Sequence, residues 1–95
     1  MNKKAYILIY SDVKMDRQDV QRWADAERKV ITWRYDLPNS FYLVSENSAS
    51  ELADSFAETF GKVRFLITEI STNRQGFLPK NTWYFLRNKK LREEN

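Results

Sequence analysis

The sequence predicts an α+β domain with a four-stranded antiparallel sheet and two helices on one face. Three observations support this prediction. An apolar run at residues 5–10 is typical of a buried strand, two segments carry helix N-caps followed by apolar residues at helical spacing, and an alternating hairpin pattern lies between them. A further apolar run at residues 63–70 completes the order β-α-β-β-α-β, the ferredoxin-like split βαβ arrangement with strand order 4-1-3-2. This fold hosts many unrelated activities, so it does not define a function by itself.

The first strand, residues 5–10, is apolar on both of its alternating faces. This pattern favours a central strand that is covered on both sides. We expect Ile7 and Ile9 to face the helices. The opposite face is then expected to carry the other alternating set, which comprises Tyr6, Leu8 and Tyr10.

Capping residues predict where the two helices begin. Asp16 is a suitable N-cap for a first helix, whose narrow apolar stripe comprises Val20, Trp23 and Ala24. Ser48 and Glu51 form a capping box for a second helix, and Gly61 is suited to its C-terminal end. Both helices are therefore expected to pack one face onto the sheet.

Two segments remain to be placed. Residues 30–36 and 41–46 alternate as two arms of a hairpin, joined by a loop of four or five residues around Pro38. Beyond the βαββαβ unit of residues 1–71, Pro79 is suited to the first position of a helix that runs to about Lys90. The composition of residues 82–86 leaves a strand as the alternative to this helix. The C-terminal end of the predicted helix carries basic residues that suit a helix C-terminus: Arg87, Lys89, Lys90 and Arg92.

Length and composition limit the chemistry. The 95 residues form one small domain with a net charge of +3, no cysteine and no histidine. Disulfides, thiolate chemistry, a histidine base and the commonest zinc ligand are excluded, which leaves carboxylates with Mg²⁺ or Mn²⁺ as a catalytic option. The lack of cysteine suits a reducing compartment, so we expect a cytoplasmic location. The apolar runs are shorter than the ~20 residues that span a bilayer, so we expect no membrane partner.

One face of the predicted sheet lacks a helix and needs a cover. A second copy of the chain is the occupant we expect, because the face combines an apolar centre with arginines near its rim. Stacking of unpaired bases on the tyrosines, or coverage by the C-terminal helix, are the alternatives. The residues expected on this face are Tyr6, Leu8, Tyr10, Arg34, Tyr42, Arg64 and Leu66.

Asp12 is the candidate catalytic residue and metal ligand. It follows the first strand, and in a two-fold dimer two such carboxylates could hold one Mg²⁺ or Mn²⁺ that activates water against a phosphodiester. The alternative is an Asx-turn. The candidate nucleic-acid contacts are Lys14, Arg17, Arg34 and Arg64, with a solvated face of mixed charge as the alternative.

The sequence also resembles a family. Residues 7–12, Ile-Leu-Ile-Tyr-Ser-Asp, resemble the strand-ending Tyr-Asp segment of the Cas2-like proteins, although Ser11 here separates the two residues. The hairpin of residues 33–44 and the segment 76–83 are similar to the SinR-like branch of that group. The resemblance implies a ferredoxin-like homodimer that binds RNA or DNA, with Asp12 in the position of the metal ligand.

These observations lead to two functional hypotheses. The first is a homodimeric Cas2-like protein that binds nucleic acid and has a weak metal-dependent endoribonuclease activity through Asp12. The second is a non-catalytic module that binds another protein, for example an accessory, antitoxin-like or phage inhibitor protein.

Overall fold

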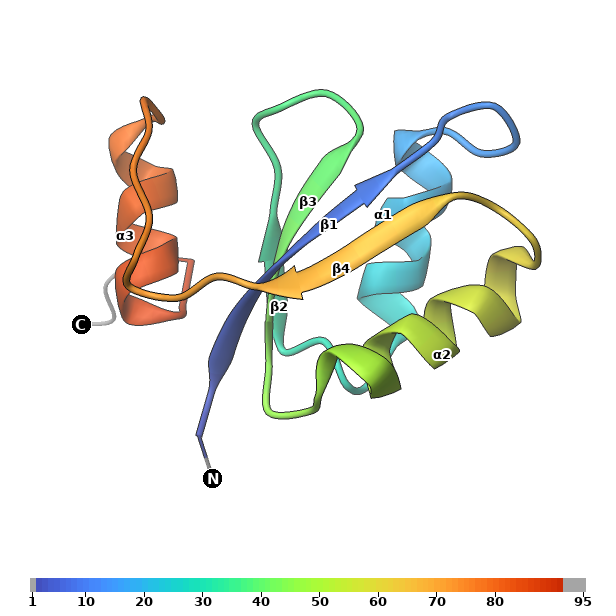
Figure 1. The fold of residues 1–95 in the computed structure, drawn as a ribbon, viewed down its shortest axis with the longest axis horizontal. Helices are drawn as coiled ribbons and strands as arrows, with labels where there is room; N and C mark the ends of the chain where they lie inside the picture. The colour runs from blue at the N-terminus through green and yellow to red at the C-terminus, as the bar shows by residue number, and fades with distance from the viewer. Residues whose placement is uncertain (1, 92–95) are drawn as a thin grey trace.

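The computed structural model of the protein describes residues 2–91, and the predictions for Arg92 and the residues after it lie outside this range. Within the described range the chain forms four strands and three helices (Figure 1). In chain order they are β1 (Lys4–Tyr10), α1 (Arg17–Ala26), β2 (Thr32–Arg34), β3 (Ser40–Ser45), α2 (Ala49–Phe60), β4 (Phe65–Glu69) and α3 (Lys80–Asn88).

The strands form one sheet with the order β2-β3-β1-β4, and all neighbouring strands are antiparallel. Read from the β4 edge, this is the order 4-1-3-2 that the sequence predicts. In the centre of the sheet Ile7 lies opposite Tyr42, and towards the other end of β1 Ile9 lies opposite Leu66. The arrangement is compatible with a ferredoxin-like fold.

The first two helices begin where their capping residues predict. Asp16 accepts a hydrogen bond from the backbone N–H of Asp19 at 2.9 Å, and the Asp19 carboxylate accepts from the Asp16 N–H at 3.0 Å. Ser48 and Glu51 form the same reciprocal pair at the start of α2. Each capping box satisfies two backbone donors that the first helical turn leaves without partners.

The main core lies between the sheet and the pair α1 and α2. Helix α1 contributes the three residues of the predicted stripe, and α2 contributes Leu52 and Phe56. The Trp23 and Phe56 rings meet edge to face with centroids 5.1 Å apart. From β1, this core receives Tyr6, Leu8 and Tyr10.

The expected orientation of β1 is therefore wrong: its tyrosines face the helices, and Ile7 and Ile9 lie on the other face. The large tyrosine rings fill the space beneath two helices. A buried tyrosine needs a hydrogen-bond partner for its hydroxyl group. The Tyr6 hydroxyl has one, because it donates to the Asn47 carbonyl at 2.5 Å. When a strand is apolar on both faces, its sequence does not show which face packs against the helices.

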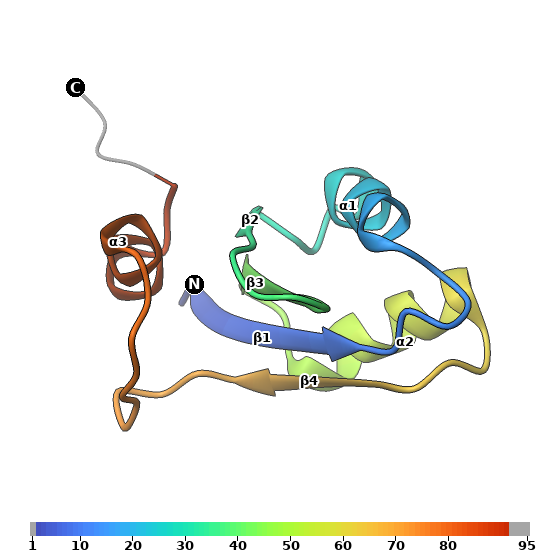
Figure 2. The ribbon, with the colours of Figure 1, turned by 90° about the horizontal axis from the view of Figure 1, so that it is seen from above.

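Helix α3 lies on the opposite side of the sheet from α1 and α2 (Figures 1 and 2). Phe85 and Leu86 of α3 pack against Ala5, Tyr42 and Val44 in a second, smaller core. The helix predicted for the C-terminal segment is confirmed, with Pro79 as its N-cap instead of its first residue and with Asn88 as its last. The chain covers part of its second sheet face with its own last helix, which is one of the alternatives that the sequence left open.

Candidate functional site

Three of the residues predicted to form an open platform are in the main core. Tyr6, Leu8 and Tyr10 are 1%, 0% and 4% exposed. None of them can stack against a base or contact a second copy without unfolding of the core. The prediction that they form a dimer or platform face is corrected by the reversed orientation of β1.

Tyr42 and Arg34 lie on the second face, as predicted, but α3 lies over them. The Tyr42 hydroxyl donates to Asp36 Oδ1 at 3.0 Å, the Thr82 hydroxyl donates to Asp36 Oδ2, and Arg34 Nε donates to Thr82 Oγ1 at 2.8 Å. Burial, and then the bond to Asp36, raise the pKa of Tyr42 well above its ordinary value. We call these four residues the α3 latch, because they join the hairpin to α3.

The rest of the second face is uncovered near the end of β1. Ile9 and Leu66 lie opposite each other there and are 46% and 57% exposed. Arg64, the residue before β4, is also exposed. The predicted place of Leu66 on this face therefore agrees with the structure.

A basic cavity lies beside this uncovered patch. It has a volume of about 250 Å³, and the loop after β1 and the loop before β4 both contribute to its wall. The Ser11 N–H donates to the Arg64 carbonyl at 3.0 Å and holds the two loops together. The wall contains three cations and no carboxylate, and its residues are Ser11, Val13, Lys14, Lys62, Val63 and Arg64.

The cavity unites only part of the predicted basic set. Lys14 and Arg64 line it together, whereas Arg34 belongs to the α3 latch. Arg17 is elsewhere, with its guanidinium carbon 4.7 Å from the centroid of the Tyr35 ring. Lys62 was not predicted. The signal for it was the antiparallel pairing of β1 with β4, which places the start of β4 beside the end of β1.

Asp12 is exposed in the loop after β1 and does not line the basic cavity. Within residues 2–91, no three potential ligands among Asp and Glu come together to hold a metal ion. The described part of the chain therefore gives the predicted Mg²⁺ or Mn²⁺ site no cluster of three carboxylates, and a second ligand from another copy stays a prediction.

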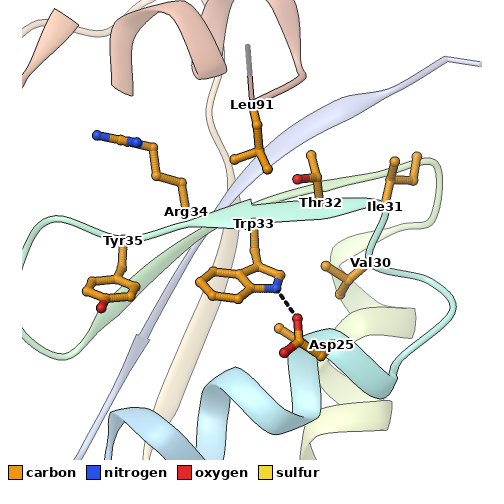
Figure 3. Close-up of a pocket in the computed structure, with 9 residues that line it drawn as sticks. Asp25, Val30, Ile31, Thr32, Trp33, Arg34, Tyr35 and Leu91 are labelled. Atoms are coloured by element: carbon orange, nitrogen blue, oxygen red, sulfur yellow. Dashed lines mark hydrogen bonds between the residues drawn. The ribbon is translucent and has the colours of Figure 1, made fainter. Parts of the chain in front are cut away.

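A second, larger cavity follows the outer edge of β2 (Figure 3). Its volume is about 530 Å³. Trp33 and Tyr35 lie on the α1 side of the strand, and Arg34 and Leu91 on the α3 side. The Trp33 indole N–H donates to Asp25 Oδ1 at 2.7 Å. We call this cavity the β2-edge groove.

Comparison with known proteins adds no assignment to this geometry. The chain matches no protein-family model, no curated protein and no solved structure. Among the helices of the described residues, none has the length and apolar character needed to cross a membrane.

Proposed function

We propose that the protein is a ferredoxin-like, Cas2-like domain that binds nucleic acid at the basic cavity. The observation that carries the proposal is the convergence of Lys14, Lys62 and Arg64 from two loops on one wall without a carboxylate. Lysine and arginine side chains arranged in this way suit phosphate groups of a nucleic-acid backbone.

The surroundings of the cavity favour an extended, single-stranded ligand. Val13 is strongly exposed at the cavity, and the exposed pair Ile9 and Leu66 lies on the adjoining sheet face. These aliphatic side chains can contact sugars and base faces while the cations hold phosphates. The tyrosines of β1 take no part in this proposal, because they are buried.

The test is the salt dependence of binding to labelled single-stranded RNA and DNA oligonucleotides, measured by fluorescence anisotropy. Each phosphate contact adds about 0.7 to the slope of log affinity against log salt for a single strand. Replacement of Lys14, Lys62 and Arg64 by glutamine should weaken binding and reduce the slope by up to about 2. A matched triple variant at exposed cations elsewhere carries Arg28→Gln, Lys80→Gln and Arg87→Gln.

The control variant has the same net charge as the cavity variant, so a non-specific charge effect would weaken both equally. Equal losses would contradict the proposed site. A lack of measurable binding by the unaltered protein at low salt would contradict nucleic-acid binding as a whole.

The proposal also includes homodimerisation and RNA cleavage through Asp12. Incubation of labelled RNA with Mg²⁺ or Mn²⁺ should give cleavage that EDTA stops and that Asp12→Asn abolishes. If Asp12 is only a loop residue near the basic cavity, Asp12→Asn should instead strengthen RNA binding, because one negative charge near the phosphate is removed. Cleavage that survives Asp12→Asn would refute the catalytic assignment.

A protein-binding module is the second candidate function. The exposed aliphatic pair Ile9 and Leu66 favours protein binding. Among the described strands β4 pairs only with β1, so this pair lies near an open edge of the sheet. The same patch is available to a second copy. Sedimentation of the protein and of Leu66→Lys would show whether the patch mediates self-association: the variant should be monomeric where the unaltered chain is dimeric.

A further inference from the structure

The outer edge of β2 offers backbone groups to a further strand. Within residues 2–91, β2 pairs with β3 and with no other strand. The β2-edge groove runs along this edge and extends from α1 residues on one side to Leu91 on the other (Figure 3). A strand added to a sheet lies about 4.7–4.9 Å from its neighbour, and the groove is lined by the residues of β2 to which such a strand would pair.

One wall of the groove is an ordered aromatic surface. The Trp33 and Tyr35 rings are stacked with centroids 6.2 Å apart and an interplanar angle of 10°. Asp25 fixes the indole through its 2.7 Å hydrogen bond, and Arg17 lies over the Tyr35 ring. A wall that is already ordered binds an apolar side chain with a smaller entropy cost than a mobile one.

The opposite wall combines one cation with exposed aliphatic groups. Among the described residues, Arg34 uses its Nε–H for Thr82, and the other N–H groups of its guanidinium take part in no protein hydrogen bond. These groups suit a carboxylate. Ile31 and Leu91 are about half exposed at the same groove.

We propose that the β2-edge groove binds an extended peptide of another protein as a fifth strand, with apolar and acidic residues in alternation. Alternate side chains of a strand point to opposite faces, so one set would contact Trp33 and Tyr35 and the other would reach Arg34. The three-residue length of β2 and the flanking α1 limit the site to a short segment. The groove differs in position and in partner class from the basic cavity, so it is independent of nucleic-acid binding.

The experiment uses the full chain labelled with ¹⁵N and a capped octapeptide of four Val-Asp repeats. Three comparison peptides separate the contributions of charge, alternation and backbone hydrogen bonds. They are Val-Lys repeats, a block of four valines followed by four aspartates, and the Val-Asp peptide with all amides methylated. The expected result is a saturable shift of the Thr32–Arg34 amides and of the Trp33 indole N–H. The block and methylated peptides should bind at least about tenfold more weakly, since they lose the alternation or the backbone hydrogen bonds.

Two variants test the walls, and a third is the matched control. Arg34→Gln should lower the affinity for the Val-Asp peptide about tenfold and remove the preference over Val-Lys. Ile31→Glu acts at an exposed side chain and should also weaken binding, which keeps the test valid if Arg34→Gln loosens α3. Lys3→Gln removes an exposed cation ahead of β1, which β3 separates from β2, and should leave the affinity unchanged.

Three outcomes would overturn the proposal. The first is the absence of saturable amide shifts with the Val-Asp peptide. The second is amide shifts that map to β4, or that are the same with the alternating and the block peptide. The third is a dimeric mass together with slow hydrogen exchange at the Thr32–Arg34 amides without peptide, which would assign the groove to a second copy.

Discussion

Thr82 of α3 donates a hydrogen bond to the carboxylate of Asp36, 46 residues earlier in the chain, while it accepts one from Arg34. Thr82 is fully buried, and its hydroxyl is the only group through which α3 joins the polar part of the α3 latch among the described residues. This bond adds a polar contact to the apolar packing of Phe85 and Leu86, and together they hold α3 on the second sheet face. It also decides which part of that face remains for a ligand.

The first prediction concerns this hydroxyl. Thr82→Val keeps the shape of the side chain but leaves Arg34 Nε without its hydrogen-bond partner, and Asp36 keeps only the bond from Tyr42. The loss of a partner at a buried polar group costs about 1–3 kcal/mol. Urea unfolding, followed by the fluorescence of the three tryptophans, should show a decrease in the free energy of unfolding of this size.

The control for Thr82→Val is Thr59→Val on the exposed side of α2. Its effect should stay within about 0.5 kcal/mol, because the hydroxyl there is in water. Equal destabilisation by both variants would show that Thr82 does not hold α3 through its hydroxyl.

The second prediction follows from Tyr42. Burial and the bond to Asp36 raise the pKa of Tyr42 above the ordinary value of 10.0, so the native state keeps this proton longer than the unfolded state does. The contribution to stability is complete below pH 10.0 and is lost as the pH rises towards the native pKa. Tyr42→Phe should therefore lose less stability than the unaltered protein between about pH 9 and pH 11 in urea titrations. An identical alkaline loss in both proteins would contradict the assignment.

The third prediction concerns acid. The Ser55 hydroxyl and then the Lys29 N–H donate to Glu27 and lower the pKa of its carboxyl below the ordinary value of 4.5, while the Trp23 indole donates to Ser55 at 3.0 Å. A lowered native pKa gives stability that is present above pH 4.5 and is lost as the pH falls through the native pKa. Glu27→Gln should show a smaller acid loss in unfolding titrations. Glu58→Gln, at an exposed position of α2, should follow the unaltered protein.

Local signals explain what could be predicted of the fold. The capping pairs Asp16 with Asp19 and Ser48 with Glu51 act within one helical turn, so the residues that form them are adjacent in sequence. The apolar stripe of α1 is likewise read from spacing and is buried as expected. The strand order follows from the sequence of elements, because short connections allow few arrangements.

The sites could not be predicted in the same way, because they depend on which face of β1 meets the helices. Tyr6 and Ile7 are both apolar enough for a core, and the choice is made by α1, α2 and α3 together. A shift of one residue in this choice exchanges the whole exposed set for the buried one. Lys62 joins Lys14 through the contact of two loops, and the β2-edge groove requires Leu91 to lie near Arg34.

The last prediction concerns the turn that brings Lys62 to the basic cavity. Gly61 ends α2 with φ +74° and ψ −143°, a conformation that residues with a Cβ rarely adopt. A Cβ at Gly61 would meet no atom within 4 Å, so the cost of Gly61→Ala comes from the backbone and should be about 1–3 kcal/mol in urea unfolding. Gly76→Ala is the matched control, since a Cβ there also meets open space but φ is not positive. It should be neutral or slightly stabilising, and an equal loss in both variants would contradict the backbone explanation.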